Sequence, residues 1–298
     1  MTTLAIGVDV GGTLTKFVVT DATSTVVHRS RIETDDSAAS RLPDDVRDEV
    51  ARIESRFGAA EFVGVACPGL VARDADTVYW MKGRLGVLEH LPWSRTLGRS
   101  RPVRVVNDAQ AALAGECAAG AARGCRDVVM LTLGTGVGGA VMCDGRVLAG
   151  HLGRAGHLGH ITVQASDDRD IVNTPGSLED AIGNCTIAKR SGGRFASTAD
   201  LVSAHLAGDE EATRVWLTSV RLLAAGLASI VNVVDPSRVI LGGGIATHAG
   251  RALLDPLEQW MDEYEWRPDG VGVEIVVAAL GDDAGAIGAA ALARDHST

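Results

Sequence analysis

The sequence is poor in cysteine and has no cysteine pair at the spacing of a redox or metal-binding motif. Five cysteines are scattered over 298 residues, at positions 67, 117, 125, 143 and 185, and no two of them form a CxxC pair. Such isolated thiols do not indicate a disulfide framework. Since the first residues, MTTLAIGVDV, lead directly into a predicted strand rather than a signal peptide, we expect a reducing, cytoplasmic environment.

The sequence also lacks an excess of positive charge and a long apolar run. Lys and Arg total 28 against 38 Asp and Glu, a net charge of −10, which argues against nucleic acid or an anionic membrane as the main partner. No apolar run reaches the roughly 20 residues that span a bilayer. Apolar residues nevertheless make up 46% of the chain and charged residues 22%, so the chain is not disordered.

Length and pattern predict two α/β domains. At roughly 150 residues per domain, a chain of 298 residues favours two. We place the first domain at 1–117 plus 283–298, because the last helix is expected to return to it, and the second at 118–282. The second domain contains a loop region at 145–193 that is poorly periodic and rich in Gly, His and Asp.

Apolar patterns predict strands that alternate with helices. Strand patterns bounded by turn residues cover 4–10, 16–20, 25–29, 61–66, 103–106, 128–133, 138–141, 238–241 and 273–277. Helical patterns cover 44–57, 109–122, 210–234 and 283–294. The strand–glycine turn–strand plan of residues 4–20 recurs at 128–141, which indicates a repeat in organisation.

Three glycine-rich turns each follow an apolar strand, in VDVGGT at 8–13, LTLGTGVGG at 131–139 and VILGGG at 239–244. Backbone N–H groups in such turns approach an anion closely because no Cβ blocks them, and Thr13 and Thr135 can each donate a hydroxyl to a phosphate. The turns match neither the GxxxxGK[ST] pattern nor, at the Thr-bearing turns, a GxGxxG that opens a helix. Two hairpin turns of this kind suit a triphosphate, although a tight hairpin alone also explains glycine.

Asp9 stands at the end of the first strand, beside the first glycine turn. A carboxylate there can hold Mg²⁺ through water, since magnesium usually keeps several of its waters. The alternative is that Asp9 only caps the turn.

Eight motifs occur in a fixed order over almost the whole chain: VDVGGT at 8–13, CPGLV at 67–71, VNDAQAALAGE at 106–116, LTLGTGVGGA at 131–140, GHLGRAGHLGH at 150–160, GSLEDAIG at 176–183, VILGGGIA at 239–246 and GDDAGAIGAAALA at 281–293. This set resembles the ROK family of sugar kinases, within the actin-like ATPase superfamily. The resemblance implies a two-domain α/β fold of the actin-like ATPase (ribonuclease H-like) class, with ATP and sugar in the interdomain cleft. GGTLTK also resembles the phosphate turn of eukaryotic-type pantothenate kinases, but the rest of the chain does not follow that family.

The resemblance also implies a set of site residues. It implies that the phosphates of ATP are held by Gly11, Gly12, Thr13, Lys16, Gly134, Thr135 and Gly136. It places the third turn, Gly242, Gly243 and Gly244, near the adenosine. It implies that Asn107, Asp108, His157, His160 and Glu179 bind the sugar.

Asp108 matches the catalytic base of the family. Phosphoryl transfer to an alcohol needs a group that accepts the proton of the acceptor hydroxyl. An Asp at a strand end before an Ala-rich helix is well placed for that role. The same position also suits a helix N-cap, and the two roles are compatible.

The sequence departs from the family at the sugar site. The family usually has Glu in a GExGH motif, whereas this chain has His157, with His160 at the family His and Glu179 at the second sugar-contacting Glu. A carboxylate accepts two hydroxyl bonds, while a neutral imidazole donates one and accepts one. We therefore expect a modified hexose such as an amino sugar, or a sugar-like C7 cyclitol, rather than ordinary glucose.

A second departure concerns zinc. Many members carry CxCGxxGC after the GH dipeptide, but the three aligned cysteine positions here are Asp170, Val172 and Ser177. We therefore do not expect the family's structural zinc. Three His within ten residues, His151, His157 and His160, leave a different metal site as an alternative.

The sequence thus predicts an ATP- and Mg²⁺-dependent sugar kinase that phosphorylates a hydroxyl, expected at the 6-position. A catalytically silent sugar sensor is the alternative. A sugar-responsive transcription regulator of the same family would need a helix-turn-helix ahead of the glycine motif, and only eight residues precede Asp9. By resemblance we expect a homodimer.

Overall fold

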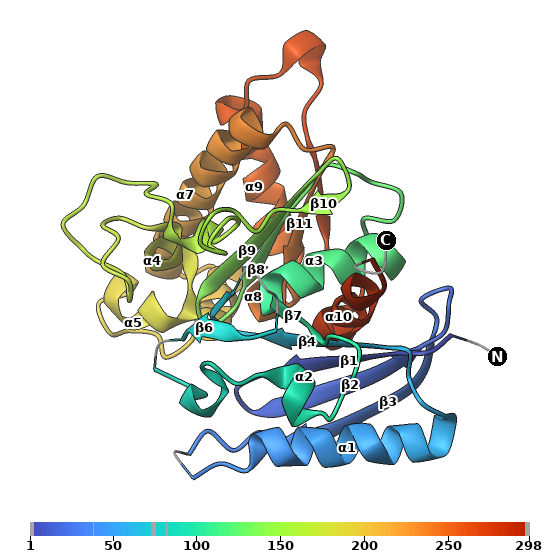
Figure 1. The fold of residues 1–298 in the computed structure, drawn as a ribbon. Helices are drawn as coiled ribbons and strands as arrows, with labels where there is room; N and C mark the ends of the chain where they lie inside the picture. The colour runs from blue at the N-terminus through green and yellow to red at the C-terminus, as the bar shows by residue number, and fades with distance from the viewer. Residues whose placement is uncertain (1–2, 38, 73–75, 82, 296–298) are drawn as a thin grey trace. The chain divides into compact units, whose positions relative to one another are not determined.

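The computed structural model of the chain describes residues 3–37, 39–72, 76–81 and 83–295. They belong to two compact units, each built around its own sheet (Figure 1). The first unit comprises the chain up to residue 124, residues 149–155, and the chain from residue 279; the second comprises 125–148 and 156–278. Residues 149–155, which we expected within the loop region of the second domain, therefore group with the first unit.

The first unit contains a five-stranded sheet in the order β3-β2-β1-β4-β7. The strands are β1 (Ala5–Val10), β2 (Leu14–Thr20), β3 (Val26–Glu33), β4 (Phe62–Cys67) and β7 (Arg104–Asn107). The first three are antiparallel neighbours, while β4 and β7 run parallel to β1. The predicted hairpin is confirmed, and the carboxyl ends of β1, β4 and β7 lie along one edge of the sheet.

Helices pack on both faces of this sheet (Figure 1). They are α1 (Leu42–Phe57), α2 (Trp93–Thr96), α3 (Asp108–Ala119) and α10 (Ala284–Asp295), with short elements β5 (Leu70–Val71), β6 (Val78–Trp80), η1 (Gly86–Leu88) and η5 (Gly281–Asp283). The amphipathic pattern that predicts α1 is confirmed, because Val46, Val50 and Ile53 are buried in the core. A Pro near its first turn and Gly58 at its end fit a helix that begins and ends there.

The two helices α3 and α10 pack against each other through small residues. A Cβ added to Gly288 on α10 would overlap the carbonyl oxygen of Ala111 on α3. Only glycine permits this backbone approach. The start of α3, which carries Asp108, is therefore braced by the C-terminal helix.

The second unit repeats the sheet of the first. Its strand order is β10-β9-β8-β11-β12, with β10, β9 and β8 antiparallel and β11 and β12 parallel to β8. The strands are β8 (Val128–Leu133), β9 (Val137–Cys143), β10 (Arg146–Val147), β11 (Arg238–Gly242) and β12 (Glu274–Val277). The predicted repeat of strand, glycine turn and strand is therefore confirmed as a repeat of topology.

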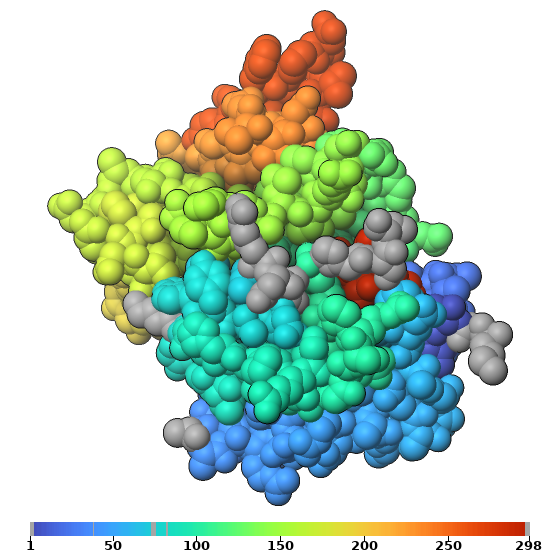
Figure 2. Space-filling model, in the orientation of Figure 1, coloured from blue at the N-terminus to red at the C-terminus, as the bar shows by residue number. Residues whose placement is uncertain are grey.

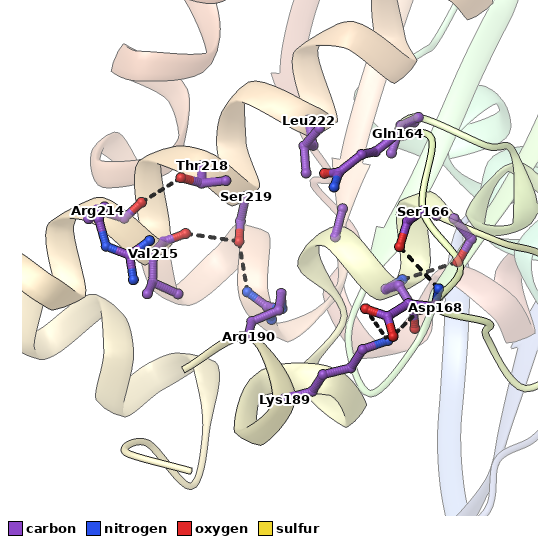
Figure 3. Close-up of a pocket in the computed structure, with 15 residues that line it drawn as sticks. Gln164, Ser166, Asp168, Lys189, Arg190, Arg214, Val215, Thr218, Ser219 and Leu222 are labelled. Atoms are coloured by element: carbon purple, nitrogen blue, oxygen red, sulfur yellow. Dashed lines mark hydrogen bonds and ion pairs between the residues drawn. The ribbon is translucent and has the colours of Figure 1, made fainter. Parts of the chain in front are cut away.

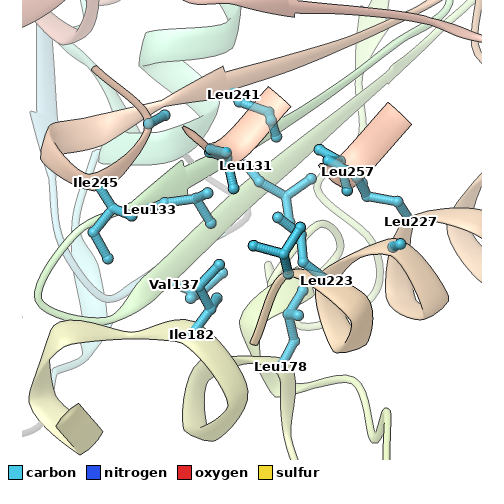
Figure 4. Packing of buried hydrophobic residues seen from close by; sticks show 14 of the residues in the cluster. Leu131, Leu133, Val137, Leu178, Ile182, Leu223, Leu227, Leu241, Ile245 and Leu257 are labelled. Atoms are coloured by element: carbon cyan, nitrogen blue, oxygen red, sulfur yellow. The ribbon is translucent and has the colours of Figure 1, made fainter. Parts of the chain in front are cut away.

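The core of the second unit lies between this sheet and its helices. Leu131 and Leu133 of the sheet face Leu223 and Leu227 across it (Figure 4). The helical elements are η2 (Leu158–His160), α4 (Leu178–Ile182), η3 (Asn184–Thr186), α5 (Ile187–Arg190), α6 (Thr198–Leu206), α7 (Glu210–Val234), α8 (Gly243–Ala249), α9 (Arg251–Tyr264) and η4 (Pro268–Gly270). By length and composition α7 alone among the described helices is apolar enough to cross a membrane, but one of its faces is buried in this core.

Helices α6, α8 and α9 do not follow from the patterns predicted above. In α9 a proline, Pro256, lies inside the helix and leaves the carbonyl of Ala252 without its helical N–H partner. The indole Nε1 of buried Trp216 on α7 donates to that carbonyl at 2.8 Å. A tertiary contact thus stabilises a helix that a local pattern would end at the proline. The connection from α9 to β12, drawn in orange, stands at the surface (Figure 2) and exposes Trp266.

Candidate active site

The first glycine turn joins β1 and β2 in the first unit. The amide of Gly11 donates to the carbonyl of Leu14 at 3.2 Å, and the amide of Thr34 donates to the carbonyl of Thr13 at 2.9 Å. The guanidinium of Arg84 donates to the carbonyl of Gly12 at 2.6 Å. The turn is thus held at both ends and has a cation beside its central glycine.

Asp9 lies on β1 directly before this turn and faces the first turn of α10. A Cβ on Gly285 would stand 2.7 Å from the Cγ of Asp9, so only glycine leaves room for the carboxyl group. The pKa of Asp9 is raised from 3.8 to about 7, mainly by burial and also by the nearby negative charges of Asp108 and Asp282. The positive charge of Lys16 acts in the opposite direction but is outweighed. When Asp9 is ionised, the single cation Lys16 therefore does not balance the negative charges around it.

Lys16 pairs with Asp9 in the β1–β2 register. Its Nζ donates to the carbonyl of Asp282 at 3.1 Å and lies 3.7 Å from the carboxylate of the same residue. Asp282 belongs to η5, immediately before α10. The predicted phosphate-binding lysine is therefore held next to Asp9 by the C-terminal segment.

Asn107 and Asp108 stand where β7 meets α3. The N-cap of α3 is Asn107, whose Oδ1 accepts from the amides of Ala109 at 3.0 Å and Gln110 at 3.4 Å. Asp108 is the first residue of the helix, so the N-cap role considered for Asp108 is wrong. The reason is geometric, because Asn107, one residue earlier, has the extended backbone that an N-cap requires.

The carboxyl of Asp108 is relieved of the capping role and is available for chemistry. One of its oxygens accepts from the amide of Ala109 at 2.8 Å. Desolvation raises the pKa of Asp108, although that amide and the side chain of Asn107 act in the opposite direction. The amide nitrogen of Asn107 also donates to the carbonyl of Gly69 at 3.2 Å, which ties this corner to the CPGLV turn.

The second glycine turn joins β8 and β9 in the second unit. The carbonyls of Gly134 and Thr135 accept from the amides of Asn184 and Cys185 at 3.0 and 2.7 Å. Behind the turn lies the buried carboxylate of Glu179, whose Oε2 accepts from the amide of Val137 at 3.0 Å. A Cβ on Gly136 would overlap that oxygen. Glu179, on α4, is therefore fixed against the turn that follows β8.

The third glycine turn differs from the other two, since β11 ends at Gly242 and α8 begins at Gly243. Gly243 has a φ of 85°, which favours glycine. A cavity of about 230 Å³ in the second unit joins the second and third turns, and it is lined by Gly134, Thr135, Asn184, Ser197, Thr198, Ala199, Val202, Gly244, Ile245, His248 and Ala249. Of the residues predicted near adenosine, Gly244 lines this cavity together with two predicted phosphate-turn residues.

The two predicted histidines lie in the segment before α4. His157 directly precedes η2, and His160 ends it. The Nδ1 of His160 lies 2.8 Å from the Oδ2 of Asp170, whose side chain is 1% exposed. The structure brings His160 close to Glu179, since these two residues and Asp170 offer atoms within 4.8 Å of one another.

A second cavity of about 200 Å³ is lined by residues of the segment 163–168, of α5 and of α7, among others (Figure 3). Lys189 bridges the carboxylates of Asp168 and Asp180 at 3.3 and 3.1 Å at its edge. Arg190 donates to the hydroxyl of Ser219 at 2.8 Å. No residue predicted for the site lines this cavity.

The donor sets differ in how well they suit metals. Asp9 offers a hard carboxylate with the charges of Asp108 and Asp282 nearby, which fits Mg²⁺ held through water. The group His160, Asp170 and Glu179, found among the residues that the structure describes, contains no thiolate and does not fit the family's structural zinc. The contact of Arg84 comes from a stretch without a pattern, so no local signal in the sequence points to it, whereas Asp282 lies in the motif at 281–293 but is not among the predicted site residues.

Comparisons with known proteins extend these observations. The model of the ROK family matches residues 5–296. An N-acetylmannosamine kinase of Escherichia coli is 32% identical over 300 residues, which cover 99% of each chain. The ROK hexokinase from Thermus thermophilus aligns with a TM-score of 0.88 and 30% identity over 99% of each chain. A ROK glucokinase from Streptomyces griseus, solved in complex with glucose and AMPPNP, aligns with a TM-score of 0.77 and 29% identity over 98% of this chain and 99% of its own.

Proposed function

The chain belongs to the ROK family and has its actin-like ATPase fold, and from this premise we propose that it is an ATP-dependent sugar kinase with Asp108 as the catalytic base. The observation that carries the assignment is the position of Asp108 at the start of α3, with Asn107 taking the cap. Its carboxyl is thus left to accept a proton. The raised pKa of Asp108 makes it a stronger base than an ordinary aspartate.

The phosphoryl donor is assigned to the two hairpin turns and the cavity beside the second. The backbone amides of Gly12 and Gly136, with the hydroxyls of Thr13 and Thr135, are donors of the kind that a triphosphate requires. The cavity that Gly134 and Gly244 line is assigned to the adenosine. The complex of the Streptomyces griseus relative with AMPPNP, an ATP analogue, supports ATP as the donor.

Three charged groups of the first unit take part in this assignment. Asp9 would hold a Mg²⁺ through water, and Lys16 would contact the phosphates. When bound, Mg²⁺ neutralises charge on the triphosphate and helps to align it for in-line transfer. The guanidinium of Arg84, next to Gly12, adds positive charge at the same turn.

The acceptor is assigned to Asn107, Asp108, His157, His160 and Glu179, with transfer to its 6-hydroxyl. Relatives of this chain are named for different sugars, glucose in one and N-acetylmannosamine in another. Because His157 replaces a carboxylate of the family motif, we propose a modified hexose such as an amino sugar, or a C7 cyclitol. An imidazole can donate to an acceptor group where a carboxylate would repel it.

A coupled ADP-release assay with Mg·ATP tests this function. The acceptors are glucose, mannose, fructose, glucosamine, 3-amino-3-deoxyglucose, N-acetylmannosamine and C7 cyclitols. Each is run beside D108N and beside D144N, a substitution of an exposed aspartate that is paired with Arg126 and belongs to no predicted site. Turnover that D108N abolishes and D144N retains supports the proposal. Binding of a sugar without turnover on any acceptor would favour the silent sensor instead.

We further propose that the enzyme acts in the cytoplasm as a homodimer. Light scattering on the purified protein tests the stoichiometry.

A further inference from the structure

Asp170 is a buried carboxylate to which the proposed function assigns no role. It lies in the segment between η2 and α4, which has no long helix or strand of its own. Its side chain is 1% exposed, and no Lys or Arg is paired with it among the described residues. A buried carboxylate without a cation must be satisfied by hydrogen bonds.

Four donors converge on Asp170. Its Oδ1 accepts from the amides of Val172 at 3.0 Å and Thr174 at 2.8 Å. Its Oδ2 lies 2.8 Å from the Nδ1 of His160, and the hydroxyl of Ser177 also bonds to the carboxylate. Burial alone would raise the pKa of Asp170, but these hydrogen bonds together hold it below its ordinary value. The group is therefore an ionised acceptor.

Two of these donors come from positions that align with the family's cysteines. The sequence aligns Asp170, Val172 and Ser177 with the three family cysteines, and His160 with the family His. Three of these four positions donate, through the Val172 amide, the Ser177 hydroxyl and the His160 ring, to the carboxylate of the fourth. The side chain of Asp170 thus holds the segment between η2 and α4 together by hydrogen bonds.

We propose that Asp170 is a positioning residue that fixes the tautomer of His160, in place of a metal ion. An ionised carboxylate accepts and does not donate, so Nδ1 of His160 carries its proton. When the ring carries this single proton, its Nε2 has a lone pair and accepts a hydrogen bond from a hydroxyl of the acceptor. This inference rests on the proposed function for the identity of the ligand, but not for the tautomer itself.

The other charged and titratable neighbours of His160 leave this assignment in place. Glu179 on α4 offers an oxygen within 4.8 Å of the same cluster, and one of its oxygens is engaged by the amide of Val137. His157 lies in the same segment, three residues earlier. Asp168, two residues before Asp170, is bound instead to Lys189.

The substitution D170N reverses the hydrogen bond without removing the side chain. The amides of Val172 and Thr174 require an acceptor, so the Asn oxygen takes the place of Oδ1 and its NH₂ faces His160. That NH₂ donates, so Nδ1 must accept and the proton moves to Nε2. The matched control is D168N, an aspartate of the same segment that contacts Lys189 and not His160.

The primary measurement is ¹⁵N NMR of His160, assigned with H160Q, without any sugar. At pH 8 we expect the Nδ1–H tautomer in the wild type and in D168N, and the Nε2–H tautomer in D170N. An Nε2–H tautomer in the wild type, or one unchanged in D170N, would overturn the proposal. This readout requires no turnover, so it stands even where the kinase assignment fails.

Kinetics and metal content give two further readouts. In D170N we expect the KM of the acceptor to rise about tenfold or more, as for one lost hydrogen bond, with the KM of ATP unchanged. Equal changes in both constants would indicate a merely structural role. Elemental analysis should find zinc well below one ion per chain, and stoichiometric zinc that a chelator removes with loss of the fold would refute the replacement.

Discussion

The substitution Gly136→Ala tests whether Glu179 is part of the acceptor site. The added Cβ overlaps the Oε2 of Glu179, which must retreat by about 1 Å to restore an ordinary contact. The 3.0 Å hydrogen bond from the amide of Val137 is then lost. A hydrogen bond to a charged group contributes about 1.5–3 kcal/mol, so we expect the acceptor KM to rise between about tenfold and a hundredfold.

The same turn supplies the control. A Cβ on Gly134 meets no heavy atom within 4 Å, so Gly134→Ala leaves Glu179 in place. Steady-state kinetics with the best acceptor, varying acceptor and ATP separately, should show a raised acceptor KM for Gly136→Ala only. A raised KM for ATP is the effect expected of Gly134→Ala, since its new methyl group would stand at the proposed phosphate site. An acceptor KM within twofold of the wild type in Gly136→Ala would refute the role given to Glu179.

Three other predictions concern charge and packing. Since the pKa of Asp9 is raised to about 7, the stability contributed by its protonated form is lost as the pH rises from about 4 through 7. In urea unfolding without Mg²⁺, the stability that Asp9→Asn gains over the wild type should therefore be much larger at pH 8.5 than at pH 4, and the same substitution should abolish turnover. Arg84→Gln should raise the KM of ATP several-fold and leave that of the acceptor unchanged, and equal effects would contradict its place beside the phosphates. In chemical denaturation, Trp216→Phe should lower the free energy of unfolding by about 1–3 kcal/mol, because the carbonyl of Ala252 loses its hydrogen-bond donor. In a Pro256→Ala background residue 256 has an N–H that can donate to this carbonyl, so a smaller loss there would identify the carbonyl as the cause.

The strands and the glycine turns are predictable because their signals are local. Apolar runs bounded by glycine mark β1, β2, β8 and β9, and the structure has each of them within a few residues of the predicted bounds. The long helix α7 follows from its apolar stripe for the same reason. Local pattern thus suffices wherever one element buries its own face.

Other features depend on contacts between residues far apart in the sequence, so local sequence patterns do not predict them. Helix α9 survives a proline because of an indole on α7, and no window of sequence contains both. The choice of Asn107 over Asp108 as N-cap depends on where β7 ends, a boundary that pattern places only within a residue or two. The sequence shows that the family cysteines are absent. It does not show that Asp170 accepts four hydrogen bonds, because the fold brings the four donors to it.

The packing of α10 against α3 has a consequence for how the protein is made. The strands of the first unit leave the ribosome early, yet the helix that covers Ala66 and Val106 of its sheet is translated only at residues 284–295. Residues 156–278 of the second unit are by then already synthesised. An apolar face of the first unit therefore stays exposed until α10 is synthesised. A nascent chain that stalls before α10 would bind chaperones instead of folding into an active kinase that lacks only its last helix.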